Sequence, residues 1–132
     1  IALCMIDINK QKMQYAGANL PLYIIRGNEL IQIPGDKHPI GLLVKDKVFK
    51  FKNNEVDLRK GDMLYIFSDG YADQLGGETG FHKFMYKRFR ELLMKIKDES
   101  MEDQLRLLDE NLKNWMGNQS QLDDIIIIGF KI

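Results

Sequence analysis

The sequence predicts an α+β domain in which a mostly antiparallel sheet is followed by a helix pair and a closing strand. Three observations support this class. Short β-rich runs separated by turn residues fill the first half of the 132-residue chain, helical periodicity begins only after residue 78, and an apolar run returns at 125–132. Strands, then helices, then one strand is an order typical of a layered α+β fold. The length suits one domain with its own core.

Four short runs at the start of the chain predict an antiparallel meander. Turn residues at Asn9-Lys10, Asn19 and Gly27-Asn28 separate them, and no helical segment lies between. Neighbouring runs should therefore pair as hairpins. The predicted strands are IALCMIDI (1–8), KMQYAGA (12–18), PLYIIR (21–26) and ELIQIP (29–34).

The middle of the chain combines a loop, a half-exposed strand and a buried strand. Glycine and proline mark GDKHPIGLL (35–43) as a loop, and charged residues alternate with apolar ones in VFKFKNNEVDLRKGD (48–62), as in a half-exposed strand. Its end, Lys60-Gly61-Asp62, is typical of a turn. The run MLYIF (63–67) carries no charged residue and predicts a central strand buried on both faces.

Two helices follow. Apolar residues at helical spacing from Phe81 to Ile96 predict a first helix of about five turns. Ser100 and Asp103 resemble a capping box that begins a second helix, which should end at Gly117. The residues expected to face inward are Phe81, Phe84, Met85, Phe89, Leu92, Leu93 and Ile96 in the first helix, and Met101, Leu105, Leu108, Leu112 and Trp115 in the second.

Composition excludes several classes of partner. Nineteen Lys and Arg balance nineteen Asp and Glu, so the chain lacks the positive surplus of a nucleic-acid binder, and we interpret the basic residues of 82–97 as a solvated helix face. Cys4 is the single cysteine, which excludes an internal disulfide and favours a reducing compartment. No apolar run is long enough to span a bilayer. We therefore predict no nucleic-acid partner, no membrane contact and a cytoplasmic location.

Carboxylates lie at the ends of two apolar runs. Asp69 directly follows the strand 63–67, and Asp123-Asp124 directly precede the final run. If these two strands are antiparallel neighbours, the carboxylates meet at one rim of the sheet. A divalent cation would relieve their repulsion, and oxygen ligands without nearby His or Cys favour Mg²⁺ or Mn²⁺ over Zn²⁺. Gly70 would let the backbone turn sharply away after Asp69.

A simpler interpretation of the same residues stays open. An aspartate after a strand is also a common turn or cap residue, and Asp-Gly is ordinary turn chemistry. We interpret Asp62 and Asp73 as turn residues, His38 as a loop residue and His82 as a helix-surface residue. Neither histidine has an identifiable Ser or Cys partner, so nothing indicates a nucleophilic triad.

Several blocks together resemble a known family. The blocks GDMLYIFSDGYADQLGG (61–77), LLDENLKNWMG (107–117) and QLDDIIIIGFKI (121–132) follow YAGANLPLYII (15–25) and GDKHPIGLL (35–43). In this order they resemble the C-terminal part of the metal-dependent phosphatases of the protein phosphatase 2C superfamily. The most similar branch is the one named after stage II sporulation protein E, which includes the sigma-factor regulation phosphatases. The resemblance covers nearly all of the chain.

The resemblance implies an αββα sandwich that hydrolyses phosphoserine or phosphothreonine with water activated between two Mn²⁺ or Mg²⁺ ions. It assigns Asp69 and Asp123 as metal ligands, with Ser68, Gly70 and Asp124 as supporting residues beside them. The implied substrate is a phosphorylated regulatory protein in bacterial signal transduction, such as an anti-sigma-factor antagonist.

Two departures from the family pattern modify this expectation. The family's bridging ligand comes from an Asp-x-x-Gly-His-Gly block, which this sequence lacks, and Ile125-Ile126 stand where the family often has Thr or Ser. We therefore expect residues 1–132 to be a single partial domain, the C-terminal portion of a phosphatase domain, and to be inactive when isolated. A sheet without one helical layer should also expose an apolar face and favour a homodimer.

A second class of function remains an alternative. The chain could be a non-catalytic interaction or dimerisation module with a degenerate phosphatase fold, which uses the helices of 80–116 to bind a partner. The presence of both Asp69 and Asp123 argues for the enzyme, because a degenerate module has no reason to keep both.

Overall fold

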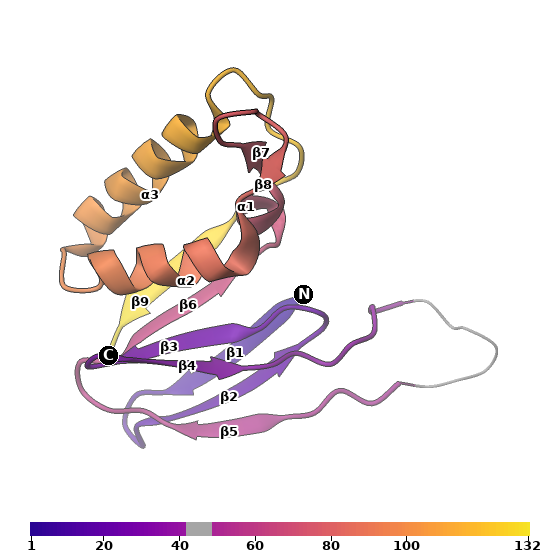
Figure 1. Ribbon diagram of the computed structural model, residues 1–132. Coiled ribbons are helices and arrows are strands. Elements are labelled where there is room, and N and C mark those ends of the chain that lie inside the picture. Colours follow the sequence, from indigo (N-terminus) through magenta and orange to yellow (C-terminus); the bar gives the residue numbers. More distant parts are fainter. Residues whose placement is uncertain (42–48) are drawn as a thin grey trace. The chain divides into compact units, whose positions relative to one another are not determined.

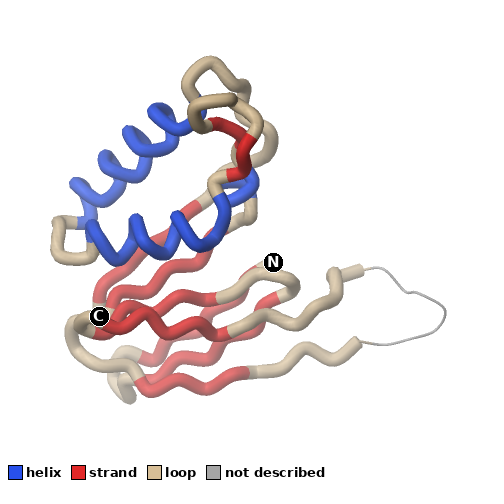
Figure 2. Tube along the Cα trace, viewed as in Figure 1, coloured by secondary structure: helices blue, strands red, loops and turns tan. Residues whose placement is uncertain are grey.

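The computed structural model describes residues 1–41 and 49–132, which form two compact units. The first unit is Ile1–Phe67 with Lys131–Ile132, and the second is Ser68–Phe130. Strands build the first unit, and the second carries all helices of the described residues (Figures 1 and 2). The α+β class predicted from the order of elements is confirmed.

The first unit contains two groups of antiparallel strands. One has the order β1 (Ala2–Asp7), β2 (Lys12–Gly17), β5 (Asn54–Asp57), and in the other β3 (Leu22–Arg26) lies between β4 (Glu29–Ile33) and β6 (Met63–Phe67). The predicted hairpins β1–β2 and β3–β4 are confirmed, and each contains a short turn because the chain between its strands is too short for a crossover. The continuous meander was a wrong prediction, because β2 pairs with β5 and β3 pairs with β6 instead of with each other.

The strand β6 is buried as its composition predicts. Met63, Leu64 and Tyr65 are each at most 3% exposed, and β3 beside it contributes Ile24 and Ile25 at 1% and 2%. Consecutive buried residues show that side chains on both faces of β6 are covered. The edge strand β1 differs, because Leu3 and Met5 on one of its faces are 66% and 63% exposed.

The predicted strand at 48–62 is shorter than expected. Only Asn54–Asp57 pairs as a strand, and Phe49–Asn53 do not. The ring of His38 instead contacts Phe49 and Phe51, each with 4.6 Å between ring centroids, while Lys52 N donates to Asp36 Oδ2 at 2.8 Å. These contacts replace ladder pairing. Val48 and the end of the predicted loop, 42–43, lie outside the described residues.

Asp62 does more than form a turn. Its carboxylate is 1% exposed and accepts hydrogen bonds from Arg26 Nε (2.9 Å), Arg26 Nη2 (2.7 Å) and Arg59 N (2.9 Å). Burial opposes ionisation, but the bonds from Arg26 and Arg59 outweigh it and hold the pKa of Asp62 below its ordinary value. The residue therefore forms a buried ion pair at the start of β6.

The second unit begins with three short elements and a helix that starts later than predicted. It contains α1 (Gly70–Asp73), β7 (Leu75–Gly76), β8 (His82–Lys83), α2 (Met85–Ile96) and α3 (Met101–Met116), and β9 (Ile127–Lys131) continues from it into the first unit. Because His82-Lys83 pair with β7, Phe81 precedes α2 and is 78% exposed. The inward position of Phe81 and the placement of His82 on a helix were wrong predictions.

The helix α3 has the predicted ends but a rotated face. Ser100 Oγ accepts a bond from Asp103 N at 3.1 Å, and Gly117 N donates to Lys113 O at 3.0 Å. Leu108 is buried, but Leu105 is 69% exposed and Gln104 is 1% exposed in its place. Gln104 can face inward because its amide donates to Glu99 O at 3.1 Å, beyond the end of α2. Met85 and Met101, also expected inward, are 54% and 38% exposed.

Candidate functional site

Asp69 lies between β6 and α1. Its backbone carbonyl accepts the hydrogen bond of Asp73 N at 2.9 Å and so begins the helix, while its side chain makes no capping bond. The carboxylate is exposed, and no described residue pairs with it. The side chain is therefore held at a fixed place by its backbone while its oxygens remain available.

Ser68 joins this point to the segment before β9. Its Oγ donates to Asp124 O at 2.7 Å and accepts from Ile126 N at 3.0 Å, and its own N–H donates to Ile126 O at 2.9 Å. The segments that carry Asp69 and Asp123-Asp124 thus lie side by side, as the strand pattern predicts. The roles of these aspartates as ligands stay predictions.

Glycine is required at position 70 because the segment of Asp124 lies very close to it, and not because the backbone turns sharply. Its φ is not positive, but a Cβ at this position would lie 2.5 Å from Asp124 O and 3.1 Å from Ile125 Cγ1. Real Cβ atoms do not approach a carbonyl oxygen so closely, so only glycine lets the two segments meet here. The supporting role expected of Gly70 therefore has a different physical reason from the one predicted.

Asp123 and Asp124 are both exposed. Asp123 Oδ1 accepts a bond from Asp124 N at 2.7 Å, and Gln121 Nε2 donates to Asp123 O at 2.7 Å. The carboxylate of Asp124 has no partner among the described residues. These carboxylates, with Asp69, form an acidic edge that no described basic side chain neutralises.

The donor chemistry of this edge fits a hard divalent cation. Exposed carboxylates without His or Cys suit Mg²⁺ or Mn²⁺. Within 1–41 and 49–132, however, no three His, Cys, Asp or Glu side chains lie close enough together to hold a metal ion.

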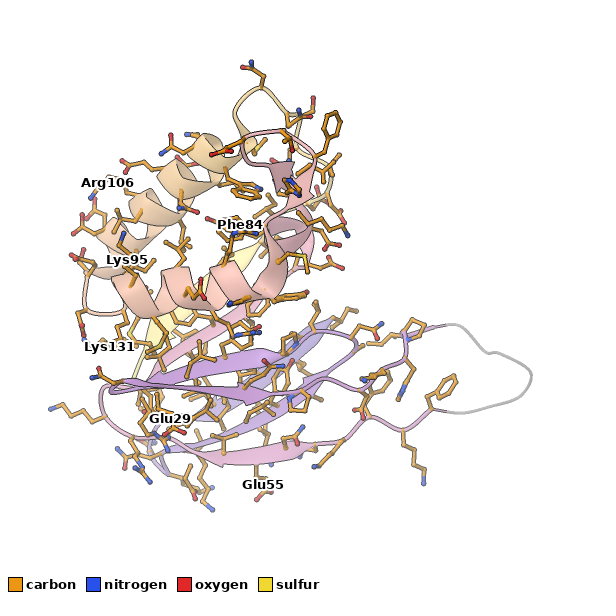
Figure 3. The ribbon with its side chains drawn as sticks, in the orientation of Figure 1. Glu29, Glu55, Phe84, Lys95, Arg106 and Lys131 are labelled. Carbon is orange, nitrogen blue, oxygen red and sulfur yellow. The ribbon has the colours of Figure 1, made fainter. Side chains whose placement is uncertain are left out.

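Tyr71 fixes the helix that follows Asp69. It is 2% exposed, its hydroxyl donates to Leu108 O at 2.9 Å, and its ring lies 5.1 Å from that of Phe84 and 5.0 Å from that of Phe89. Burial raises the pKa of Tyr71 far above its ordinary value. Phe84, labelled in Figure 3, lies between α2 and α3. Its ring centroid is 5.3 Å from that of Trp115.

Gln74 also belongs to the surroundings of the acidic edge. This side chain, which no sequence pattern indicated, is fully buried and hydrogen-bonded to the segment that leads to Asp123. A buried glutamine after a short helix carries no periodic signal, so only the structure finds it.

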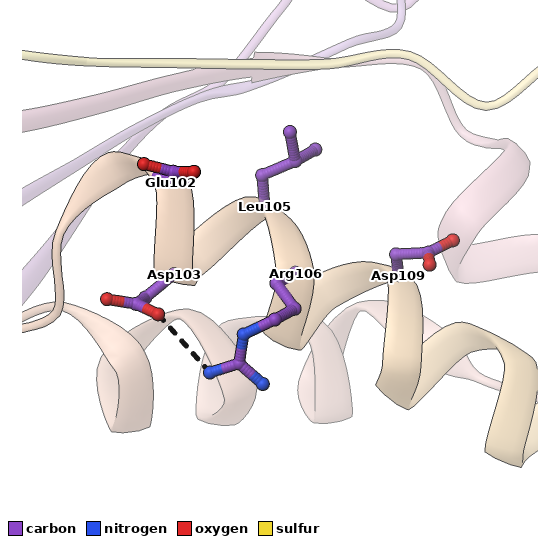
Figure 4. Close-up of a pocket in the computed structure, with 5 residues that line it drawn as sticks. All are labelled: Glu102, Asp103, Leu105, Arg106 and Asp109. Carbon is purple, nitrogen blue, oxygen red and sulfur yellow. Dashed lines mark hydrogen bonds and ion pairs between the residues drawn. The ribbon is translucent and has the colours of Figure 1, made fainter.

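A hollow on the surface of α3 is separate from these carboxylates. It measures about 530 Å³ and is lined by Glu102, Asp103, Leu105, Arg106 and Asp109 (Figure 4). Arg106 bonds Asp103 at 3.3 Å and Glu110 at 2.9 Å, so its charge is already paired. The hollow therefore resembles a solvated helix face more than a reaction site. No helix of the described residues is both long and apolar enough to cross a membrane.

Comparisons with known proteins identify relatives of the whole chain. The family model described as stage II sporulation protein E (SpoIIE) matches residues 1–132. The SiaA-PP2C domain of Pseudomonas aeruginosa is 31% identical, with a TM-score of 0.89 over 99% of this chain and 50% of that one. The phosphatase domain of SpoIIE from Bacillus subtilis is 17% identical, with a TM-score of 0.71 over 100% of this chain and 57% of that one.

A third structure has the same fold. The RsbU and RsbW domains of a Mycobacterium tuberculosis protein are 17% identical, with a TM-score of 0.69 over 98% of this chain and 35% of that one. Among curated protein sequences, none is significantly similar. The chain spans about half the length of the SiaA and SpoIIE structures that it matches.

Proposed function

Because the chain belongs to the stage II sporulation protein E family, we propose that it is the C-terminal part of a metal-dependent serine/threonine protein phosphatase domain. The observation that carries the proposal is the set of Ser68 hydrogen bonds, which places the strand end with Asp69 beside the segment with Asp123 and Asp124. The carboxylates at this edge have no cationic partner among the described residues.

We assign Asp69 and Asp123 as metal ligands, with Asp124 beside them and Ser68 and Gly70 as the residues that hold the two segments together. Two Mn²⁺ or Mg²⁺ ions, when bound in the complete domain, would polarise a phosphate oxygen and lower the pKa of water. One solved structure of the related SpoIIE phosphatase domain is described as Mn presoaked, which is in keeping with this choice of metal.

The chain alone should be inactive or nearly so. Two metal ions at short distance repel, and bridging negative ligands must offset that repulsion. Among the described residues, no three carboxylates lie close enough together to hold a metal ion, and the chain spans half of the SiaA domain. We propose that the remaining ligands come from the rest of the phosphatase domain.

The substrate class follows from the family. We propose a phosphoserine or phosphothreonine on a regulatory protein, such as an anti-sigma-factor antagonist, in the cytoplasm of a bacterium. The similarity to a protein with an RsbU domain supports a regulatory setting. The balanced net charge is consistent with a protein substrate and not with nucleic acid.

One observation favours a second candidate, a non-catalytic dimerisation module. Leu3 and Met5 of the edge strand β1 are 66% and 63% exposed, and Ile1 directly before the strand is 70% exposed, which together make an apolar face that a second copy could cover. A dimerisation module, however, does not need unpaired carboxylates at Asp69 and Asp123.

Hydrolysis of p-nitrophenyl phosphate with added Mn²⁺ tests the proposal. We expect no turnover by this chain, and turnover by the complete phosphatase domain that contains it. In the complete domain, Asp69→Asn should lower turnover by more than the roughly 10–100-fold typical of residues behind metal ligands. Asp73→Asn is the matched control, because Asp73 lies in α1 but pairs with Lys83 at 3.1 Å.

The outcomes separate the candidates. Equal turnover by wild type and Asp69→Asn would contradict the assignment of Asp69 as a ligand. An inactive complete domain that dimerises would favour the second candidate. Turnover by the 132-residue chain that Asp69→Asn abolishes would show that the two carboxylates suffice.

A further inference from the structure

The buried side chain of Gln74 uses both ends of its amide. Nε2 donates to Ser120 O at 2.9 Å and to Leu75 O at 3.1 Å, and Oε1 accepts from Leu122 N at 3.2 Å. The residue is 0% exposed. The amide of Gln74 therefore holds the segment of Ser120–Leu122 in place by donating one hydrogen bond to it and accepting one from it.

The backbone of Gln74 is itself held firmly. Its carbonyl accepts from Trp115 Nε1 at 3.1 Å and from Phe84 N at 3.0 Å. A Cβ on Gly76 would collide with the backbone carbonyl of Trp115, so the chain after Gln74 lies directly against the end of α3. The backbone that carries the Gln74 side chain is thus held in place by contacts with α3 and with the residue before α2.

The backbone on each side of Asp123 is held by hydrogen bonds from a side chain that is distant in the sequence. On one side Gln74 holds Ser120 and Leu122, and on the other Ser68 holds Asp124 and Ile126. The carboxylate of Asp123 bonds only to the neighbouring N–H of Asp124 among the described residues. Its position is therefore determined by the backbone on each side and not by contacts of its own.

We propose that Gln74 is a positioning residue that sets the place of Asp123 for binding a divalent cation. The inference rests on the proposed function, in which Asp123 is a metal ligand. Ser68 acts on the far side of Asp123 and cannot substitute, because it reaches no residue before Asp124. Without the amide, Ser120 O and Leu122 N lose their partner and residues 119–123 gain freedom.

The variant Gln74→Met tests this, since it keeps the volume and removes the hydrogen bonds. The matched control is Gln104→Met. Gln104 is also buried, at 1% exposure, and lies in the same unit, but its amide donates to Glu99 O and Lys97 O at the end of α2. Loss of either amide should destabilise the chain, so stability alone does not distinguish the two.

Two measurements on the complete phosphatase domain that contains this chain do distinguish them. The first is Mn²⁺ titration, followed by paramagnetic broadening of amide NMR signals, which detects weak binding. We expect Gln74→Met to weaken Mn²⁺ affinity about tenfold, the lower end of effects of residues behind metal ligands, and Gln104→Met to leave it unchanged. The second is amide hydrogen exchange without metal, which should accelerate at 119–124 in Gln74→Met only.

Wild-type Mn²⁺ affinity in Gln74→Met, or unchanged exchange at 119–124, would overturn the inference. Asp123→Asn separates this from failure of the proposed function. If Asp123→Asn abolishes Mn²⁺ binding and Gln74→Met does not weaken it, only the inference fails. If wild type binds no Mn²⁺, or binds it equally after Asp123→Asn, both fail. Should Gln74→Met not fold, Gln74→Asn, whose shorter amide cannot reach both Ser120 and Leu122, should weaken binding in the same direction.

Discussion

The two ends of β6 carry aspartates in opposite situations. Before the strand, Asp62 is 1% exposed and receives hydrogen bonds from Arg26 and Arg59. After it, Asp69 is exposed and has no partner among the described residues. The fold provides a counter-charge for one carboxylate and leaves the other without one. The comparison teaches that a buried, paired aspartate serves stability, whereas an unpaired aspartate on a rigid backbone is suited to bind a cation.

Replacing Asp62 should have the largest effect. In Asp62→Ala the guanidinium of Arg26 loses its bidentate partner, and we expect the free energy of unfolding to fall by about 3 kcal/mol, the low end for a broken buried pair because Arg26 still reaches solvent. Urea unfolding of the chain measures this. Asp69→Ala should change stability by less than about 0.5 kcal/mol, and equal losses in the two variants would remove the contrast.

Replacing Gly70 should have an intermediate effect on stability and a specific effect on metal. In Gly70→Ala the new Cβ would press on Asp124 O, and we expect a loss of about 2 kcal/mol from overpacking. The segment with Asp69 should move away from the segment with Asp123 and Asp124. The broadening of amide NMR signals by Mn²⁺ should therefore become weaker as well.

Gly27→Ala is the control for the Gly70 variant. Gly27 has φ +59°, and a Cβ added there would meet nothing within 4 Å, so the substitution costs only backbone strain of about 1 kcal/mol. It should not alter Mn²⁺ binding. If Gly70→Ala binds Mn²⁺ as wild type does, the closeness of Gly70 to Asp124 is unimportant for the site.

The smallest of these effects is expected from acid, which should remove the contribution of Asp62 to the free energy of unfolding. Because the pKa of Asp62 is lowered on folding, the unfolded chain binds this proton more tightly than the folded chain does. The contribution of Asp62 is therefore fully present above the unfolded value near 3.9 and is lost as pH falls through the lower folded pKa. Thermal unfolding between pH 2 and 6 should show a shallower acid loss in Asp62→Asn than in wild type. The same slope in both would contradict this linkage.

The sequence predicts the elements better than their faces. The continuous burial of β6, and the caps at Ser100 and Gly117, follow from local rules and are confirmed. Phe81 and Leu105 were placed inward because hydropathy treats every apolar residue at helical spacing alike. Phe81 cannot lie on the buried face of α2, because the β7–β8 pairing occupies the residues just before the helix begins. On α3, Gln104 takes the buried place expected for Leu105, because its amide donates a hydrogen bond at the end of α2.

The candidate site was only partly predictable. Asp69 and Asp123 follow from the ends of apolar runs and from the family resemblance. The hydrogen bonds of Ser68 and Gln74 join residues far apart in the sequence, and the ion pair of Arg26 with Asp62 does the same. No local pattern encodes such partners, because each bond depends on how distant segments pack.

The position of Trp115 gives this chain a built-in optical reporter. Trp115 is the single tryptophan of the sequence, and its indole N–H bonds the carbonyl of Gln74 while Arg88 lies 4.9 Å from its ring centroid. Its emission therefore arises from one place, next to the residue that holds the segment before Asp123. Ordinary fluorescence, without any attached dye, can follow that place during titration with a cation or a phosphorylated peptide.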